Sequence, residues 1–135
     1  MRKRVFGKKL SRERGSREAL FVSLVESLVK HRKINTTKAK AKAISGYVDK
    51  LVNLAKKDTL AGKRQVLKNL RGNKEIATIL WKDIAKLFTD KTGGYTRIIP
   101  LVSRKGDMAE MVRMEWTYKM GTSKDENLST KTKRN

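Results

Sequence analysis

The chain has 135 residues, 38% hydrophobic and 35% charged, and its 34 Lys and Arg against 13 Asp and Glu give a formal net charge of +21. This length fits one domain with one modest core, and the lack of cysteine excludes a disulfide framework and a thiolate metal site. Because one-sign charge of this size opposes the compact state, the sequence predicts a polyanionic partner, either nucleic acid or an anionic membrane surface.

Residues 1–15 are predicted to form a basic arm. Seven Lys and Arg side chains face one acid, Glu13, and the apolar residues are sparse and without a clear period. Gly7 and Gly15 are expected to break any helix here. Alone in water, such a segment cannot bury enough apolar surface to fold.

Four helices are expected next, over 16–33, 37–57, 59–70 and 73–90, because apolar residues recur at spacings of three and four in each. Residue types that cap helix N-termini stand at the expected starts: Ser16, Thr36 or Thr37, Asp58 or Thr59, and Asn73. Gly72 and the pair Gly93-Gly94 follow the third and fourth helices.

The chain then changes period. Residues 95–102 are rich in strand-forming residues, with Pro100 indicating an edge, a bulge or a strand end. Residues 103–107 are typical of a turn, and residues 109–118 alternate, with Val112, Met114, Trp116 and Tyr118 on one face. Two strands make a marginal sheet, so residues 34–36 are expected to add a third.

These elements predict an α+β, two-layer fold in the order α-β-α-α-α-β-β, with the helices covering one face of the sheet. The expected organisation is a basic arm over 1–15, a single α+β domain over 16–118, and a flexible polar tail over 119–135, which is rich in Lys, Ser and Thr.

Three further segments are candidate phosphate contacts. In the first segment, a helix, a short strand and a second helix are expected to meet. It contains His31, Arg32, Thr36 and Thr37, followed by Lys38, Lys40 and Lys42. Hydroxyls and free N–H groups at a helix start can hold a phosphate, although Thr36 or Thr37 could equally serve as an N-cap alone.

The second and third segments are 93–97 and 104–107. Tyr95 could stack on a base and Arg97 could bind a phosphate, or the glycines could end a helix and place Tyr95 in the core. The turn that carries Arg104 and Lys105 could contact RNA or simply be soluble. Trp81 and Trp116 fall in patterned segments and are expected to pack in the core.

No catalytic set is apparent. The single histidine, His31, sits in a basic cluster, and no P-loop or dinucleotide fingerprint occurs. No apolar stretch is long enough to span a bilayer, and residues 1–10 lack the apolar segment of a secretory signal. We therefore expect a cytoplasmic nucleic-acid-binding protein without a metal or cofactor. The alternative hypotheses are a dimeric DNA-binding nucleoid protein and an RNA-modifying enzyme.

The sequence resembles the bacterial-type large-subunit ribosomal protein family L-seventeen over about residues 1–117. Motif order and spacing agree throughout. The matching segments are Met1-Arg2-Lys3-Arg4, Gly7-Lys8-Lys9-Leu10, Ser16-Arg17-Glu18-Ala19, Ser27-Leu28-Val29-Lys30-His31, Ile34-Asn35-Thr36-Thr37, Lys40-Ala41-Lys42, Leu54-Ala55-Lys56, Gly93-Gly94-Tyr95-Thr96-Arg97-Ile98 and Arg104-Lys105-Gly106-Asp107. The sequence departs from the family at Ser16, where histidine is frequent, at Glu110, where proline is common, and in the tail.

The resemblance implies a helix, a strand, three helices and two strands with a small mixed sheet, and no catalytic activity. It implies binding to large-subunit ribosomal RNA near the outer end of the peptide exit tunnel, with neighbouring large-subunit ribosomal proteins as further partners and no small-molecule substrate. Together with the basic segments, it assigns RNA contact to Arg2, Lys3, Arg4, Lys8, Lys9, Arg12, Arg14, Arg17, His31, Arg32, Thr36, Thr37, Lys40, Lys42, Gly93, Gly94, Tyr95, Thr96, Arg97, Arg104 and Lys105.

Overall fold

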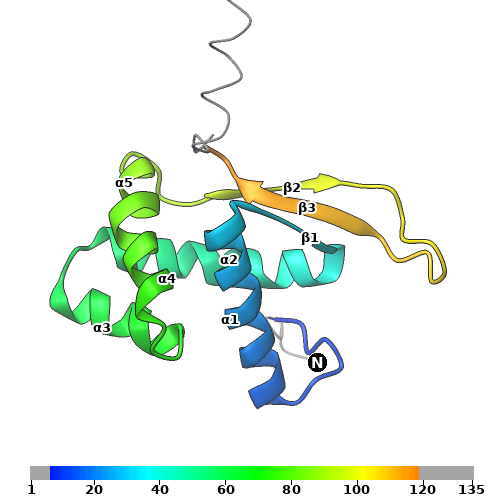
Figure 1. The fold of residues 1–135 in the computed structure, drawn as a ribbon, viewed down its shortest axis with the longest axis horizontal. Coiled ribbons are helices and arrows are strands. Elements are labelled where there is room, and N and C mark those ends of the chain that lie inside the picture. The colour runs from blue at the N-terminus through cyan, green and yellow to red at the C-terminus, as the bar shows by residue number, and fades with distance from the viewer. Residues whose placement is uncertain (1–6, 119–135) are drawn as a thin grey trace, which may run out of the picture.

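The structure is a computed structural model that describes residues 7–118. Its elements follow the predicted order (Figure 1). They are α1 (Arg14–His31), β1 (Lys33–Thr37), α2 (Lys38–Lys56), α3 (Leu60–Asn69), α4 (Lys74–Ile79), a π-helical turn (Leu80–Ile84), α5 (Ala85–Leu87), β2 (Thr96–Pro100) and β3 (Met111–Trp116).

The three strands form one sheet in the order β1-β3-β2. Both pairings are antiparallel, with Met114 of β3 opposite Ile34 of β1 and Ile98 of β2. The expectation of a mixed sheet is therefore wrong: β1 and β2 run in the same direction, but β3 lies between them, so no parallel pair forms. The hairpin and the third strand are confirmed, and Pro100 lies at the end of the edge strand β2, where its missing N–H costs least.

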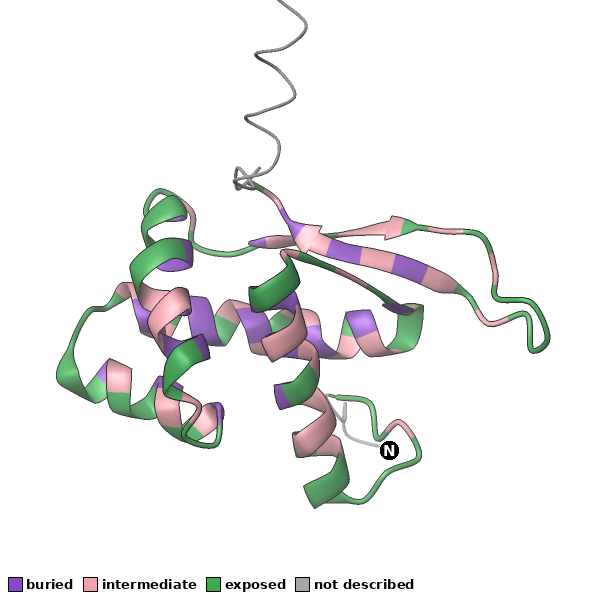
Figure 2. Cartoon of the chain, viewed as in Figure 1, coloured by how far each residue is buried: buried purple, intermediate pink, exposed green. Residues whose placement is uncertain are grey.

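One face of the sheet packs on the helices, with α1 and α2 beneath it, so the two-layer prediction is confirmed (Figure 1). The inward side chains of β3 alternate with half-buried ones, as Figure 2 shows along the strand. Val112, Met114 and Trp116 are buried as predicted. Tyr118 follows the strand and is 42% exposed, so its predicted inward position is wrong, although its ring lies 5.2 Å from that of Phe88.

The core joins α1, α2, the α3–α5 segment and the sheet into a single cluster. Its largest fully buried side chains include Tyr95, Phe88, Leu28 and Ile44. Trp116 packs there as predicted, and its indole N–H donates to the Leu28 carbonyl at 3.3 Å. Trp81 is partly buried against the same cluster.

Two of the expected caps are confirmed, because the Thr59 and Asn73 side chains accept hydrogen bonds from the N–H groups of Gly62 and Ile76. The Ser16 cap is wrong: α1 begins at Arg14, with Glu13 at the N-cap position, and Gly15 lies inside the helix rather than breaking it. An ion pair between Arg14 and Glu18, one helical turn apart, supports this earlier start.

The fourth predicted helix is interrupted. Residues 73–90 were expected to form one helix, but the π-helical turn separates α4 from α5, and the helix ends at Leu87. Apolar spacing alone does not distinguish a π turn from an α turn here, because the buried residues Ile76, Leu80, Ile84 and Phe88 keep the four-residue spacing that is also typical of an α-helix.

Candidate nucleic-acid interface

The described part of the basic arm is held against the start of α1. Lys8, Lys9 and Arg12 are exposed. The Arg12 N–H donates to the Lys9 carbonyl at 3.2 Å, and the Arg17 guanidinium donates to the Arg12 carbonyl at 3.2 Å. The Arg17 side chain therefore holds the end of the arm next to α1, through the backbone carbonyl of Arg12. The predicted contacts Arg2, Lys3 and Arg4 lie outside the described residues.

The junction of α1, β1 and α2 presents some of the predicted residues and buries another. His31 and Lys42 are exposed, and Arg32 adopts a left-handed conformation at the end of α1. Thr36 is 8% exposed and pairs with the buried Val112, so its side chain faces the helices. A direct contact through the Thr36 hydroxyl is not supported by this position; the residue acts in the fold instead.

Thr37 is the N-cap residue of α2, without a side-chain cap bond. The first N–H of that helix, on Lys38, donates to the Glu110 carbonyl at 3.0 Å, and the Lys38 ammonium lies 2.8 Å from the Glu110 carboxylate. The Lys38 hydrogen bond lowers the pKa of Glu110. Glu110, where the family commonly has proline, thus connects the start of α2 to the start of β3. Lys38 and Lys42 line a hollow of about 460 Å³ beside the hairpin, and Lys40 is half-buried.

The segment 93–97 is divided between surface and core. Gly93 and Gly94 are exposed, and Gly94 has a positive φ of 64°, which suits glycine. Tyr95 is fully buried, and its ring meets Phe88 edge-on at 5.0 Å. Base stacking by Tyr95 is therefore corrected: the ring is a core residue, which was the alternative interpretation of this motif.

Partly buried polar contacts hold Tyr95 in place. Its hydroxyl lies within hydrogen-bonding distance of the Asn53 side chain and the Lys91 carbonyl, and it accepts from the Lys56 ammonium at 3.3 Å. Its backbone N–H donates to Asp49 at 3.4 Å. These contacts come from the C-terminal half of α2 and from the loop after α5. They fix where the exposed glycines and Arg97 sit.

Arg97 and the hairpin tip carry exposed cations that already have acidic partners. Arg97 donates through Nε to Glu115 at 2.6 Å, across the β2–β3 pair. Arg104 forms an ion pair with Asp107, and its hydrogen bond, followed by that of the Ala109 N–H, lowers the pKa of Asp107 to about 2. Lys105 is exposed beside them.

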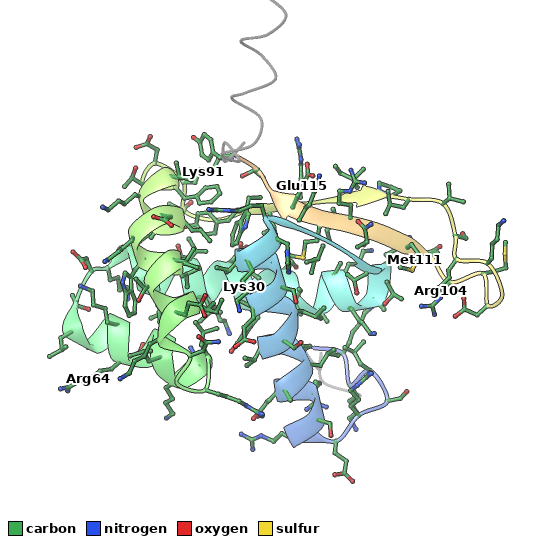
Figure 3. The ribbon with its side chains drawn as sticks, viewed as in Figure 1. Lys30, Arg64, Lys91, Arg104, Met111 and Glu115 are labelled. Carbon is green, nitrogen blue, oxygen red and sulfur yellow. The ribbon has the colours of Figure 1, made fainter. Side chains whose placement is uncertain are left out.

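The predicted residues do not converge on one pocket. Arg104 lies on the hairpin at one end of the long axis (Figure 3), whereas Lys8 and Lys9 precede α1 and His31 ends it. The α2 start and the Tyr95 network lie at opposite ends of a 19-residue helix, about 28 Å at 1.5 Å per residue. Thr96, half-buried opposite Trp116, lies beyond the network. The candidate site is a set of separated basic segments, which suits a large folded partner.

The uncovered face of the sheet adds cations that the motifs alone did not single out. Lys33, Arg97 and Arg113 lie on it with Glu115, because residues paired in register point to the same face. Alternation in β3 had placed Arg113 on the outward face, but only the strand order shows that β1 and β2 contribute further basic side chains there.

Other chemistries find no support in the described residues. Within residues 7–118, no three His, Cys, Asp or Glu side chains are close enough to hold a metal ion. None of the helices there has the length and apolar character needed to cross a bilayer.

The fold and the distribution of charge define a small basic protein of the α+β class, with a single core and exposed basic segments. The model of the family "Ribosomal protein L17" matches residues 20–117. "Large ribosomal subunit protein bL17" of Persephonella marina is 49% identical over 117 residues, covering 86% of this chain and 94% of the relative. The proteins of the same name from Sulfurihydrogenibium sp. (45%, covering 86% and 96%) and Rubrobacter xylanophilus (41%, covering 81% and 89%) are also similar.

The chain belongs to the ribosomal protein L17 family. This confirms the resemblance on which the sequence interpretation rested. The family is a structural component of the ribosome and not an enzyme, so the chain is a structural constituent of the large ribosomal subunit in the cytoplasm, and the nucleoid and RNA-modifying alternatives are set aside.

Proposed function

We propose that this protein binds large-subunit ribosomal RNA through its separated basic segments, near the outer end of the peptide exit tunnel, and contacts neighbouring ribosomal proteins there. The observation that carries the proposal is a net charge of +21 on a chain with a modest core. We also propose the division into an arm over 1–15, a domain over 16–118 and a tail over 119–135.

The electrostatics support a phosphate-rich partner. Several acids of the described region are already occupied by internal cations, among them Glu18, Asp58, Asp107, Glu110 and Glu115. The exposed cations in excess of these pairs include Lys8, Lys9, Lys42 and Lys105. RNA phosphates neutralise such side chains and release condensed counterions. Arms and loops that approach from several directions suit the irregular surface of folded RNA.

Binding of the full chain to purified large-subunit ribosomal RNA tests the first part. If about eight phosphates are contacted, the log–log slope of affinity against salt is about −6 to −7. Replacing Lys8, Lys9 and Lys105 by Gln should make the slope shallower by about 2–3. The matched control is Arg64→Gln, at the far end of the molecule from the hairpin. A flat salt response, or equal affinity for duplex DNA at matched salt, would contradict the proposal.

The tunnel location is testable because the chain has no cysteine. A single Lys105→Cys substitution at the exposed hairpin tip can carry a tethered hydroxyl-radical source in reconstituted large subunits. RNA cleavage should concentrate around the tunnel outlet. A source at Arg64→Cys provides the comparison and should give a different pattern, because the two positions lie at opposite ends of the molecule. Cleavage confined to RNA far from the outlet would refute this location.

A further inference from the structure

A hollow of about 350 Å³ lies where the first turns of α1 meet the middle of α2 and the end of α3. Two aromatic rings, three cations and one carboxylate line it: Phe21, Tyr47, Arg14, Lys68, Arg71 and Glu18. Only Arg14 of these belongs to the predicted RNA contacts. The six residues come from three segments far apart in sequence, so no local motif announces them.

The aromatic side of the hollow is fixed in place. The Phe21 and Tyr47 rings lie 6.0 Å apart at 45°, and both pack against the core while remaining partly exposed. The Tyr47 hydroxyl donates to the Asn69 carbonyl at 2.8 Å, which ties the ring to the end of α3. Burial, with a smaller effect of Glu18, raises the pKa of Tyr47, so the phenol stays neutral. A flat ligand therefore meets a preorganised apolar wall.

The cationic side is held by bonds within the chain. Arg14 donates to Glu18 at 2.9 Å, and the Arg71 guanidinium donates to the Gly15 carbonyl at 3.3 Å, bridging the turn after α3 to the first turn of α1. Three cations against one carboxylate leave a net charge of +2. Lys68 and Arg71 are exposed and keep further donors for an anion.

These features match the chemistry of a nucleotide. A base stacks on aromatic rings and a phosphate binds Arg and Lys. Glu18 can accept hydrogen bonds from base N–H groups, because a carboxylate is an acceptor only. An acidic peptide, the other anionic ligand that three cations could attract, has carboxylates for the cationic side but need not have a ring to lie against Phe21 and Tyr47.

We propose that this hollow binds one unpaired nucleotide of RNA, with its base against Phe21 and Tyr47 and its phosphate on Lys68 and Arg71. The proposal rests on the proposed RNA-binding function and adds a site that reads a base rather than the backbone alone. It also implies that the start of α1 contacts RNA on the side turned toward α3.

The test compares two probes of equal charge on the full chain: a uridine heptamer and an abasic ribose-phosphate heptamer. Base stacking on an aromatic side chain contributes at least a fivefold gain in affinity, so the wild-type protein should bind the uridine heptamer about fivefold or more tightly. Phe21→Leu should reduce this preference below about twofold. Lys68→Gln should weaken both probes alike, and Arg64→Gln, also on α3 but outside the hollow, should change neither.

A second measurement uses the unaltered protein, which removes any effect of Phe21→Leu on folding. A heptamer containing 5-iodouridine, irradiated in complex, should crosslink to Phe21 or Tyr47, as mass spectrometry can show. Three outcomes overturn the inference: a base preference that survives Phe21→Leu, crosslinks confined to other residues, or an acidic heptapeptide that competes at the hollow. Each leaves the proposed function standing if ribosomal RNA still binds; loss of ribosomal RNA binding would end both.

Discussion

The buried hydroxyl of Tyr95 offers the sharpest test of how the fold positions the 93–97 segment. Tyr95→Phe keeps the ring and its edge-on contact with Phe88 but removes the group that contacts Asn53, Lys91 and Lys56. A hydroxyl donates one proton at a time, so the substitution removes one donated bond and the bond accepted from Lys56.

Each net hydrogen bond contributes about 0.5–1.5 kcal/mol. The partners are not all left buried and unpaired, because the Lys91 carbonyl keeps its bond from Lys56 and the Asn53 side chain reaches water. We therefore expect the free energy of unfolding to fall by about 1–2 kcal/mol. For a domain of this size, the melting temperature should drop by about 4–8 °C.

Urea denaturation monitored by circular dichroism measures this loss. Tyr118→Phe is the matched control, because Tyr118 is exposed and contacts its neighbours, Phe88 and Lys91, through the ring. It should change the unfolding free energy by less than about 0.5 kcal/mol. If Tyr95→Phe proves no more destabilising than Tyr118→Phe, the network does not hold the segment and the argument fails.

Three further predictions concern glycine positions, pH and the arm. Gly46→Ala should stabilise α2 by about 1 kcal/mol, because an added Cβ meets nothing within 4 Å. Gly62→Ala should destabilise the protein by about 1–3 kcal/mol, because its Cβ would lie 2.9 Å from the Leu54 carbonyl oxygen. Thermal melts in which both substitutions shift the melting temperature in the same direction would contradict this packing. In an NMR titration the Asp107 carboxylate should show a pKa of about 2. Because this folded-state pKa lies below the usual 3.8, the stabilisation from the Asp107 interactions is present above pH 3.8 and is lost as the pH falls through about 2. A titration midpoint near 3.8 in the native protein would refute the pairing with Arg104. Deleting residues 1–12 should leave cooperative unfolding intact but weaken ribosomal RNA binding; loss of the folded state would make the arm part of the core.

The elements that sequence reasoning placed correctly are those with local signals. Apolar spacing located the helices, Thr59 and Asn73 marked two of their starts, and alternation identified the inward face of β3. The errors at α1 and after α4 have local causes that a single pattern does not weigh. The ion pair between Arg14 and Glu18 favours a start of α1 before Gly15, and a π-helical turn, which has one extra residue, interrupts the fourth helix.

The features that escaped prediction depend on contacts between distant segments. The motif at Tyr95 alone favoured a core residue and the family resemblance favoured RNA contact, and what decides between them is a set of partners 39 to 46 residues earlier on α2. The hollow near Phe21 and Tyr47 is non-local in the same way. The mixed sheet was an implication of the resemblance, and only the strand order β1-β3-β2 corrects it.

The organisation of α2 connects these observations. Its first turns present Lys38 and Lys42 beside the hairpin, its middle supplies Tyr47 to the hollow, and its last turns hold the Tyr95 network. Buried residues from Ala41 to Ala55 pack this helix against the core along its length, so the three regions share the spacing of a single packed helix. The separated basic segments are therefore set at fixed spacings by one element. A rigid spacing of contacts is what a structural component of a ribosomal particle needs, because each phosphate contact is weak alone and their sum depends on simultaneous fit.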